Sequence, residues 1–272
     1  MDIVFIKTTL LLYFLGTAAY WVHLSRKSEK WFSTSLWIAS AGFIFHTASI
    51  LSRMISLGYF PLSKVYESIT FFSWALVVSF LFLGYRYKIH ILGLFALPIV
   101  LVSLCGALLL PKDLTPLSPI LQSNWFIIHT VLSITGFVFF AVAFSLGLMY
   151  LIQDRLLKKK KLTSFFHKLP PLHILDKISQ KAISIGFFIL TLGIMTGFIW
   201  ARSALGSFWV NDPKMFFALI TWIYYLMFIH GRYTSGWRSK KAAYLSVAGF
   251  VIVCCLFIIS TFIVGGGWHA FF

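Results

Sequence analysis

Long apolar runs, separated by short polar or basic stretches, make up most of this chain of 272 residues. A helix needs about 20 residues to cross a hydrocarbon core of about 30 Å. Backbone groups inside a bilayer have no water to bind, so such runs form helices that satisfy these groups internally. The pattern predicts an all-α integral membrane protein with about eight transmembrane helices, near 4–22, 33–52, 68–85, 90–110, 124–152, 180–200, 215–230 and 243–264.

The composition supports the membrane class. Hydrophobic residues make up 60% of the chain and charged residues only 11%, whereas a soluble domain has about 25% charged residues. The mean hydropathy of +0.90 agrees. The first apolar run has no small-residue cleavage site behind it, which favours a retained helix over a cleaved signal. We therefore expect one polytopic membrane domain over 1–272.

The distribution of Lys and Arg predicts the orientation. The loops after the first, third, fifth and seventh runs hold 17 of the 23 basic residues. Because basic residues collect in cytoplasmic loops, these loops are predicted to be cytoplasmic and both termini external. The net charge of +16 then needs no nucleic-acid partner. The basic cytoplasmic loop 153–179 is suited to anionic lipids, although a docking site for a protein partner is an alternative.

The external loop 201–214 carries an unusual sequence, with aromatic residues around an Asn-Asp-Pro-Lys turn. Asp212 followed by Pro213 is typical of a helix N-cap with proline at the first helical position. Trp200, Trp209 and Trp222 surround this turn. Since Trp gathers at membrane interfaces in any case, the tryptophans alone favour an interfacial belt.

Eight histidines form the main chemical inventory. His23, His90, His167 and His173 fall at or in cytoplasmic loops. The other four are His46, His129, His230 and His269. Ionisable residues in membrane spans are costly and tend to mark function.

His129 and His269 are far apart in sequence, yet both are predicted at the outer surface, level with the Trp209–Asp212 loop. Two imidazoles facing each other across an aromatic surface would suit bis-His haem ligation. Arg202, Lys214 or Arg53 could then pair with the propionates.

Several other classes find little support. The sequence shows no Ser-His-Asp set, no paired-carboxylate site and no phosphate-binding glycine loop, so no hydrolase is indicated. The three cysteines lie in apolar runs without a CxxC motif. A b-type electron-transfer cytochrome would carry two histidines on one helix, whereas each candidate span here has one. A small-solute transporter would show broken helices and a repeated half, and neither is evident in the sequence.

The chain resembles the cytochrome c assembly family of haem-handling membrane proteins, which includes CcsA/ResC-type, CcmC and HemX-like members. The segments that carry the likeness are "HTASILSRMISLGYFPLSKVYESITFFSW" (46–74), "NWFIIHTVLSITGFVFFAVAFSLGLMYLIQDRLLKKK" (124–160), "GSFWVNDPKMFFALITWIYYLMFIHGR" (206–232) and the terminal "GGGWHAFF". The segment "LDKISQKAISIGFFILTLGIMTGFIWA" (175–201) also carries it. The likeness runs over nearly the whole chain, with CcsA as the nearest type.

The resemblance implies a haem-delivery subunit of a System II cytochrome c biogenesis complex in the bacterial cytoplasmic membrane. Haem b would be held at an outer tryptophan-rich (WWD) segment between His129 and His269, and presented to the CxxCH motif of apocytochrome c. His230 matches a histidine near the inner face, whose partner ligand lies on a ResB/CcsB-type subunit. At most, the chain would be part of a haem-lyase complex.

The tryptophan-rich segment departs from the family pattern, which reads approximately WGxxWxWDPKETW. Trp209, Asp212, Pro213 and Lys214 are kept. The positions that differ are Leu205, Asn211, Met215 and Phe217. HemX-like members, which are linked to tetrapyrrole synthesis and not directly to haem attachment, show a similar loss of the segment's aromatic and acidic residues. A HemX-like accessory role is therefore the alternative.

Overall fold

The computed structural model describes residues 1–26, 29–87, 89–114, 118–161, 164–209 and 212–263. Among these residues every regular element is helical. The chain divides into two compact units. The first comprises Met1–Pro116 and Arg155–Pro170, and the second comprises Leu117–Asp154 and Pro171–Phe272.

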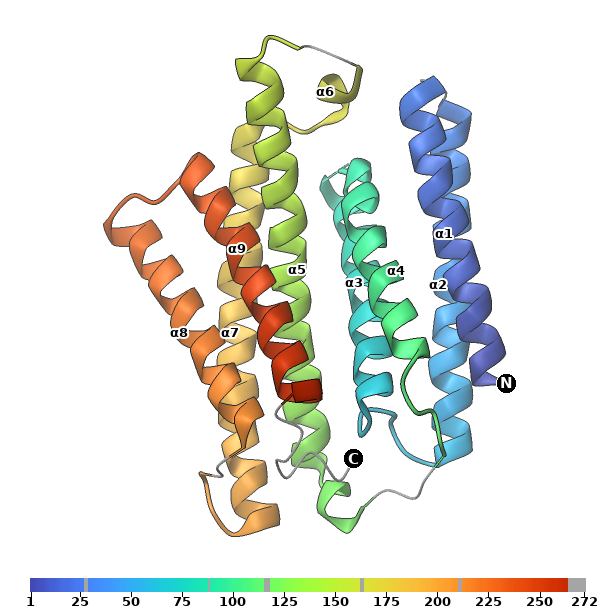
Figure 1. The fold of residues 1–272 in the computed structure, drawn as a ribbon, viewed down its shortest axis with the longest axis vertical. Helices are drawn as coiled ribbons and strands as arrows, with labels where there is room; N and C mark the ends of the chain where they lie inside the picture. Colours follow the sequence, from blue (N-terminus) through green and yellow to red (C-terminus); the bar gives the residue numbers. More distant parts are fainter. Residues whose placement is uncertain (27–28, 88, 115–117, 162–163, 210–211, 264–272) are drawn as a thin grey trace. The chain divides into compact units, whose positions relative to one another are not determined.

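The first unit is built from two helical hairpins. Helices α1 (Asp2–Arg26) and α2 (Glu29–Leu57) lie side by side, and α3 (Val65–Tyr87) pairs with α4 (Gly93–Leu108) after the 3₁₀ turn η1 (His90–Leu92) (Figure 1). The short helix α6 (Ser164–Lys168) also belongs to this unit. Lys168 Nζ donates to His23 Nε2 over 2.7 Å, which fixes α6 against the end of α1.

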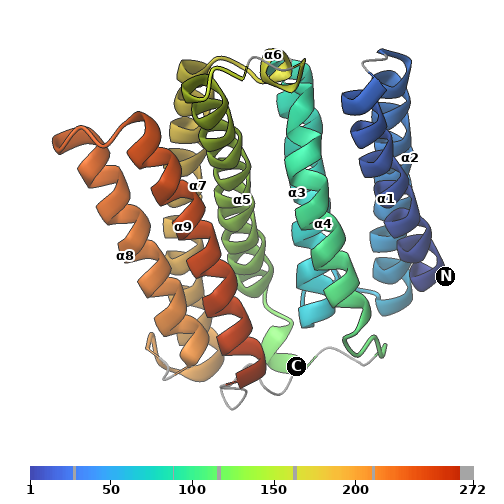
Figure 2. The ribbon, with the colours of Figure 1, turned by 45° about the horizontal axis from the view of Figure 1, so that its top comes forward.

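The second unit contains the longer helices. After the 3₁₀ turn η2 (Pro119–Leu121) come α5 (Asn124–Lys158), α7 (Leu172–Leu205), α8 (Pro213–Thr234) and α9 (Ser239–Ile258). A π-helical turn, η3 (Ile259–Ile263), extends α9. Figure 2 shows α5 and α7 side by side, with α8 and α9 beside them.

The structure confirms the all-helical membrane class, because seven of the described helices are long and apolar enough to span a bilayer. All eight predicted segments coincide with helices. The fourth, predicted at 90–110, differs: α4 has only 16 residues, about 24 Å at 1.5 Å per residue. Helices also reach further than predicted, since α5 and α7 extend into the predicted basic loop 153–179 at both ends.

Small residues bring α5 and α7 together. A β-carbon on Gly136 of α5 would lie 3.1 Å from the Gly186 carbonyl oxygen, and one on Gly193 would lie 2.7 Å from Ser133 Oγ. Such contacts leave no room for side chains between the two backbones. Close packing through small residues is typical of helices within membranes. Here it brings the backbone of α7 into contact with the histidine of α5, His129.

Candidate functional site

His129 lies in α5 with its ring against α7. The ring nitrogen Nδ1 is 2.7 Å from the carbonyl oxygen of Gly193. A carbonyl only accepts, so Nδ1 carries the proton and donates. The lone pair of the neutral ring is therefore on Nε2. This is the tautomer that a histidine needs to bind a metal through Nε2.

Gly197, one turn beyond Gly193, gives the ring its space. A β-carbon at Gly197 would lie 2.6 Å from Nδ1 of His129 and 2.7 Å from Cε1. Real β-carbons do not approach other atoms so closely. Only glycine at this position allows the imidazole to lie flat along α7 and reach the Gly193 carbonyl.

Trp200, on the next turn of α7, forms an aromatic surface parallel to the imidazole. The ring centroids are 6.4 Å apart and the planes differ by 4°. The indole is itself held, because Nε1 donates to the Ile120 carbonyl over 3.3 Å and the ring packs with Leu121 and Phe126. The structure thus brings together two of the predicted site residues, His129 and Trp200.

The last turn of α7, the loop after it and the start of α8 carry four more predicted residues: Arg202, Trp209, Asp212 and Lys214. Arg202 donates to the Gly206 carbonyl, and its guanidinium lies 5.5 Å from the centroid of the Phe208 ring. Trp209 is 46% exposed and meets Phe216 edge-on. The prediction that Asp212 caps α8 is confirmed, since Asp212 Oδ1 accepts from the backbone N–H of Lys214 over 2.8 Å, with Pro213 at the first helical position.

His230 is not part of this cluster. Its side chain is exposed near the end of α8 opposite to Asp212, and 17 helical residues after Pro213 correspond to about 26 Å. His269 lies outside the described residues.

Three residues of the site were missed in the sequence: Gly193, Thr196 and Gly197. Thr196 Oγ donates toward the same Gly193 carbonyl, at 2.9 Å. The signal that could have found the two glycines is their spacing, because Gly-x-x-x-Gly on an apolar helix marks a close helix contact.

The donor set of the second unit fits haem. A neutral imidazole with its Nδ1–H bound to a carbonyl is a suitable axial ligand. Phe208 and Trp209 offer exposed aromatic surface in the loop after α7, while the buried Trp200 supports the His129 ring. The exposed side chain of Arg202 matches a propionate in charge. These residues could hold the macrocycle through its iron, its ring and its acidic edge.

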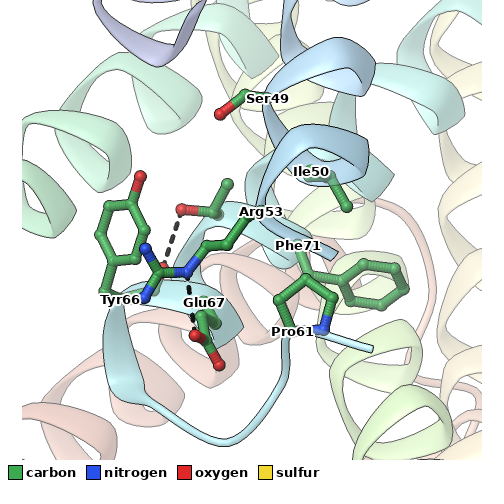
Figure 3. A pocket seen from close by; sticks show the side chains of 8 residues that line it. Ser49, Ile50, Arg53, Pro61, Tyr66, Glu67 and Phe71 are labelled. Carbon is green, nitrogen blue, oxygen red and sulfur yellow. Dashed lines mark hydrogen bonds and ion pairs between the residues drawn. The ribbon is translucent and has the colours of Figure 1, made fainter. Parts of the chain in front are cut away.

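The first unit contains a separate buried polar cluster, seen beside a small pocket in Figure 3. Arg53 Nε donates to Glu67 Oε1 over 2.9 Å, and Nη1 donates to Asp2 Oδ2 over 3.0 Å. The guanidinium also lies over the Tyr66 ring, 4.9 Å from its centroid. Arg53 is therefore already paired with two carboxylates, which makes it a structural cross-link of α1, α2 and α3 and a poor partner for a propionate.

His46 in α2 is fully buried in the same unit. Its Nδ1 lies 3.3 Å from the Tyr13 hydroxyl of α1. This contact joins α1 to α2, so a packing role accounts for His46.

The fold and site define a class: a helical membrane protein with a histidine on one helix packed against glycines and a tryptophan on another. The family model described as Cytochrome C assembly protein matches residues 62–269. This chain belongs to that family.

Relatives match this chain over almost its whole length. The cytochrome c biogenesis protein CcsA of Guillardia theta is 32% identical over 283 aligned residues, covering 97% of this chain and 94% of that protein. The CcsA protein of Gloeothece citriformis (strain PCC 7424) is 29% identical, with coverages of 97% and 95%.

A solved structure shares the fold. The chain titled Cytochrome c Heme Lyase CcmF matches 96% of this chain with a TM-score of 0.67 and 14% identity. This chain spans about half of that one, since 49% of it is covered. At this identity the likeness concerns the fold alone.

Proposed function

We propose that this protein is the haem-delivery subunit of a System II cytochrome c biogenesis complex. It holds haem b, as transported substrate, at the outer membrane face and presents it to apocytochrome c. His129 and His269 act as the two axial ligands. Membership of the cytochrome c assembly family, with CcsA relatives over almost the full length, supports this role.

The observation that carries the proposal is the fixed tautomer of His129. Its Nδ1–H is bound to Gly193 at 2.7 Å, so Nε2 keeps the lone pair that iron requires.

The other residues have supporting roles in this proposal. Trp209 offers ring surface to the macrocycle, and the buried Trp200 holds the His129 ring in its orientation. Arg202 and Lys214 neutralise the propionates. Asp212 acts indirectly, because it caps α8 and so orders the loop. His230, exposed on α8, serves an inner haem site whose second ligand comes from a ResB/CcsB-type partner subunit. Anionic lipids hold the basic segment 153–179.

The bound haem supplies two vinyl groups for attachment. Each cysteine thiol of the CxxCH motif adds across a vinyl C=C: sulfur bonds to one carbon and the thiol proton is taken up by the other. The nucleophiles come from apocytochrome c, which is why this chain needs no cysteine of its own. Its own residues bind and orient the haem.

The test is an absorption spectrum of the purified full-length protein, beside the variants His129→Ala and His269→Ala. We expect a low-spin haem spectrum in the wild type that is lost or shifted in each variant. The matched control is His46→Ala, which removes a buried histidine of the first unit and should leave the spectrum unchanged. An unaltered spectrum in both site variants would sink the proposal.

The sequence from the end of α7 to the start of α8 favours one alternative. With Leu205, Asn211, Met215 and Phe217 in place of the family's residues, less aromatic and acidic surface faces the haem. A HemX-like accessory protein, linked to haem synthesis, fits such a segment. Absence of haem from the wild type, even with a ResB-type subunit co-expressed, would favour this alternative.

A further inference from the structure

The Gly193 carbonyl beside His129 receives more donors than it has lone pairs. His129 Nδ1–H donates to it at 2.7 Å and Thr196 Oγ–H at 2.9 Å. As a residue within the α-helix Leu172–Leu205, Gly193 also accepts from the backbone N–H four residues later. A carbonyl oxygen has two lone pairs, so three donors compete for two sites.

The Thr196 hydroxyl, unlike the other two donors, has two carbonyl acceptors within reach. Its single hydroxyl proton faces two acceptors, the Gly193 carbonyl at 2.9 Å and the Leu192 carbonyl at 2.8 Å. The hydroxyl therefore shares its proton between the two carbonyls. When the hydroxyl donates to the Gly193 carbonyl, it weakens the hydrogen bond from His129 Nδ1–H to the same oxygen.

We propose that Thr196 is a positioning residue that sets the strength of the His129 Nδ1–H···O bond, and through it the electron donation from Nε2 to haem iron. The inference rests on the proposed haem ligation by His129. A stronger bond at Nδ1 makes the imidazole more basic, and a more basic axial ligand favours ferric iron and lowers the reduction potential. With its hydroxyl in competition, Thr196 keeps that potential higher.

The first test needs no haem. The full-length chain is purified from haem-deficient cells with ¹⁵N-labelled histidine, and His129 is assigned by the signals missing in His129→Gln. Thr196→Val removes the hydroxyl and keeps the side-chain shape. We expect the Nδ1-bound proton of His129 to move downfield in Thr196→Val, and to keep its wild-type position in Thr196→Ser.

The matched control is Thr135→Val on α5. Thr135 also donates to a carbonyl of its own helix, that of Val131 at 2.7 Å, but this carbonyl is not a partner of His129. A shift in Thr135→Val equal to that in Thr196→Val, or no shift in Thr196→Val, overturns the proposal. Thr196→Ala repeats the test if the valine variant does not accumulate.

The second test is a redox titration of the haem-loaded chain. We expect a more negative midpoint potential in Thr196→Val and Thr196→Ala, and a wild-type value in Thr196→Ser and Thr135→Val. Loss of the haem spectrum in His129→Ala, together with an unchanged potential in Thr196→Val, would refute this inference alone. A spectrum that survives His129→Ala would refute the proposed ligation itself.

Discussion

The His129 ring lies in the space that a β-carbon at position 197 would need. This single contact links the sequence of α7 to the chemistry of α5, because the ring must lie flat on Gly197 for Nδ1 to reach Gly193. The site therefore depends on the absence of a side chain at Gly197 of α7 as much as on the imidazole of α5.

Gly197→Ala is predicted to displace the His129 ring and to break its bond to Gly193. The added carbon would come within 2.6 Å of Nδ1, and relief of such overpacking costs about 1–3 kcal/mol. We expect a lower haem-to-protein ratio and a lower thermal unfolding midpoint, measured on the purified chain by absorbance and by a thermal melt. Gly106→Ala on α4 is the control, since a β-carbon there meets nothing within 4 Å. Equal haem content in Gly197→Ala and wild type would contradict the prediction.

How well each residue could be predicted depends on the range of its contacts. Asp212 and Pro213 follow a local rule of helix capping, so the sequence predicted their role correctly. The partners of His129 on α7 are 64 and 68 positions away in the chain. No periodicity within one segment reports such a pairing, and only the Gly-x-x-x-Gly spacing hints at it.

At the scale of elements, the start of α3 shows how a local cap becomes a cross-link. Glu67 Oε2 accepts from the backbone N–H groups of Ser63 and Lys64, at 2.9 and 3.1 Å, as the glutamate of a capping box does. Its other oxygen receives Arg53 of α2, which in turn binds Asp2 of α1. The place of Glu67 in the first turn of α3 follows from local sequence, but no local pattern indicates the arginine that joins three helices there.

Removing this arginine is predicted to destabilise the first unit. Arg53 and Glu67 side chains are 4% and 0% exposed, and breaking a buried ion pair from one side costs about 3–5 kcal/mol. We expect Arg53→Met to lower the unfolding midpoint in a thermal or detergent denaturation series. Lys7→Met, which removes an exposed cation from α1, should leave the midpoint unchanged.

A double variant separates the pair from simple loss of packing. Glu67→Gln keeps an oxygen for the N–H groups of Ser63 and Lys64 and removes the uncompensated charge. Arg53→Met/Glu67→Gln should therefore be more stable than Arg53→Met alone. If the two changes were merely additive, the cluster would not be the coupled unit that its distances indicate.

The positions of the helices followed from hydrophobic runs alone, since each run of the sequence became a helix. Their ends did not, because α5 and α7 continue through polar residues into what was predicted as loop. Basic side chains in the last turns of α5, Arg155 and Lys158, complement the negative end of the helix and favour such an extension.

For the whole molecule, the decisive element is α4. The prediction that both termini are external requires eight crossings, while seven described helices are long and apolar enough to span a membrane. Although α4 has 16 residues, it lies antiparallel to α3 (Figure 1). The turn η1 adds His90–Leu92 before it, and a 19-residue segment approaches the length that a crossing needs.

We predict that α4 crosses the membrane, and cysteine labelling in a variant without Cys105, Cys254 and Cys255 tests this. A membrane-impermeant maleimide added to intact cells should label single cysteines at Asp113 and Ser207. Cysteines at Arg86 and Lys159 should react only after permeabilisation, because the loops after the third and fifth spans are cytoplasmic by their basic charge. All four positions have exposed side chains. If α4 does not cross, positions 86 and 113 will react from the same side. Every later loop will then be inverted, with position 159 labelled from outside and position 207 protected. His129 would in that case lie at the inner membrane face. This outcome would remove the outer haem site together with the topology.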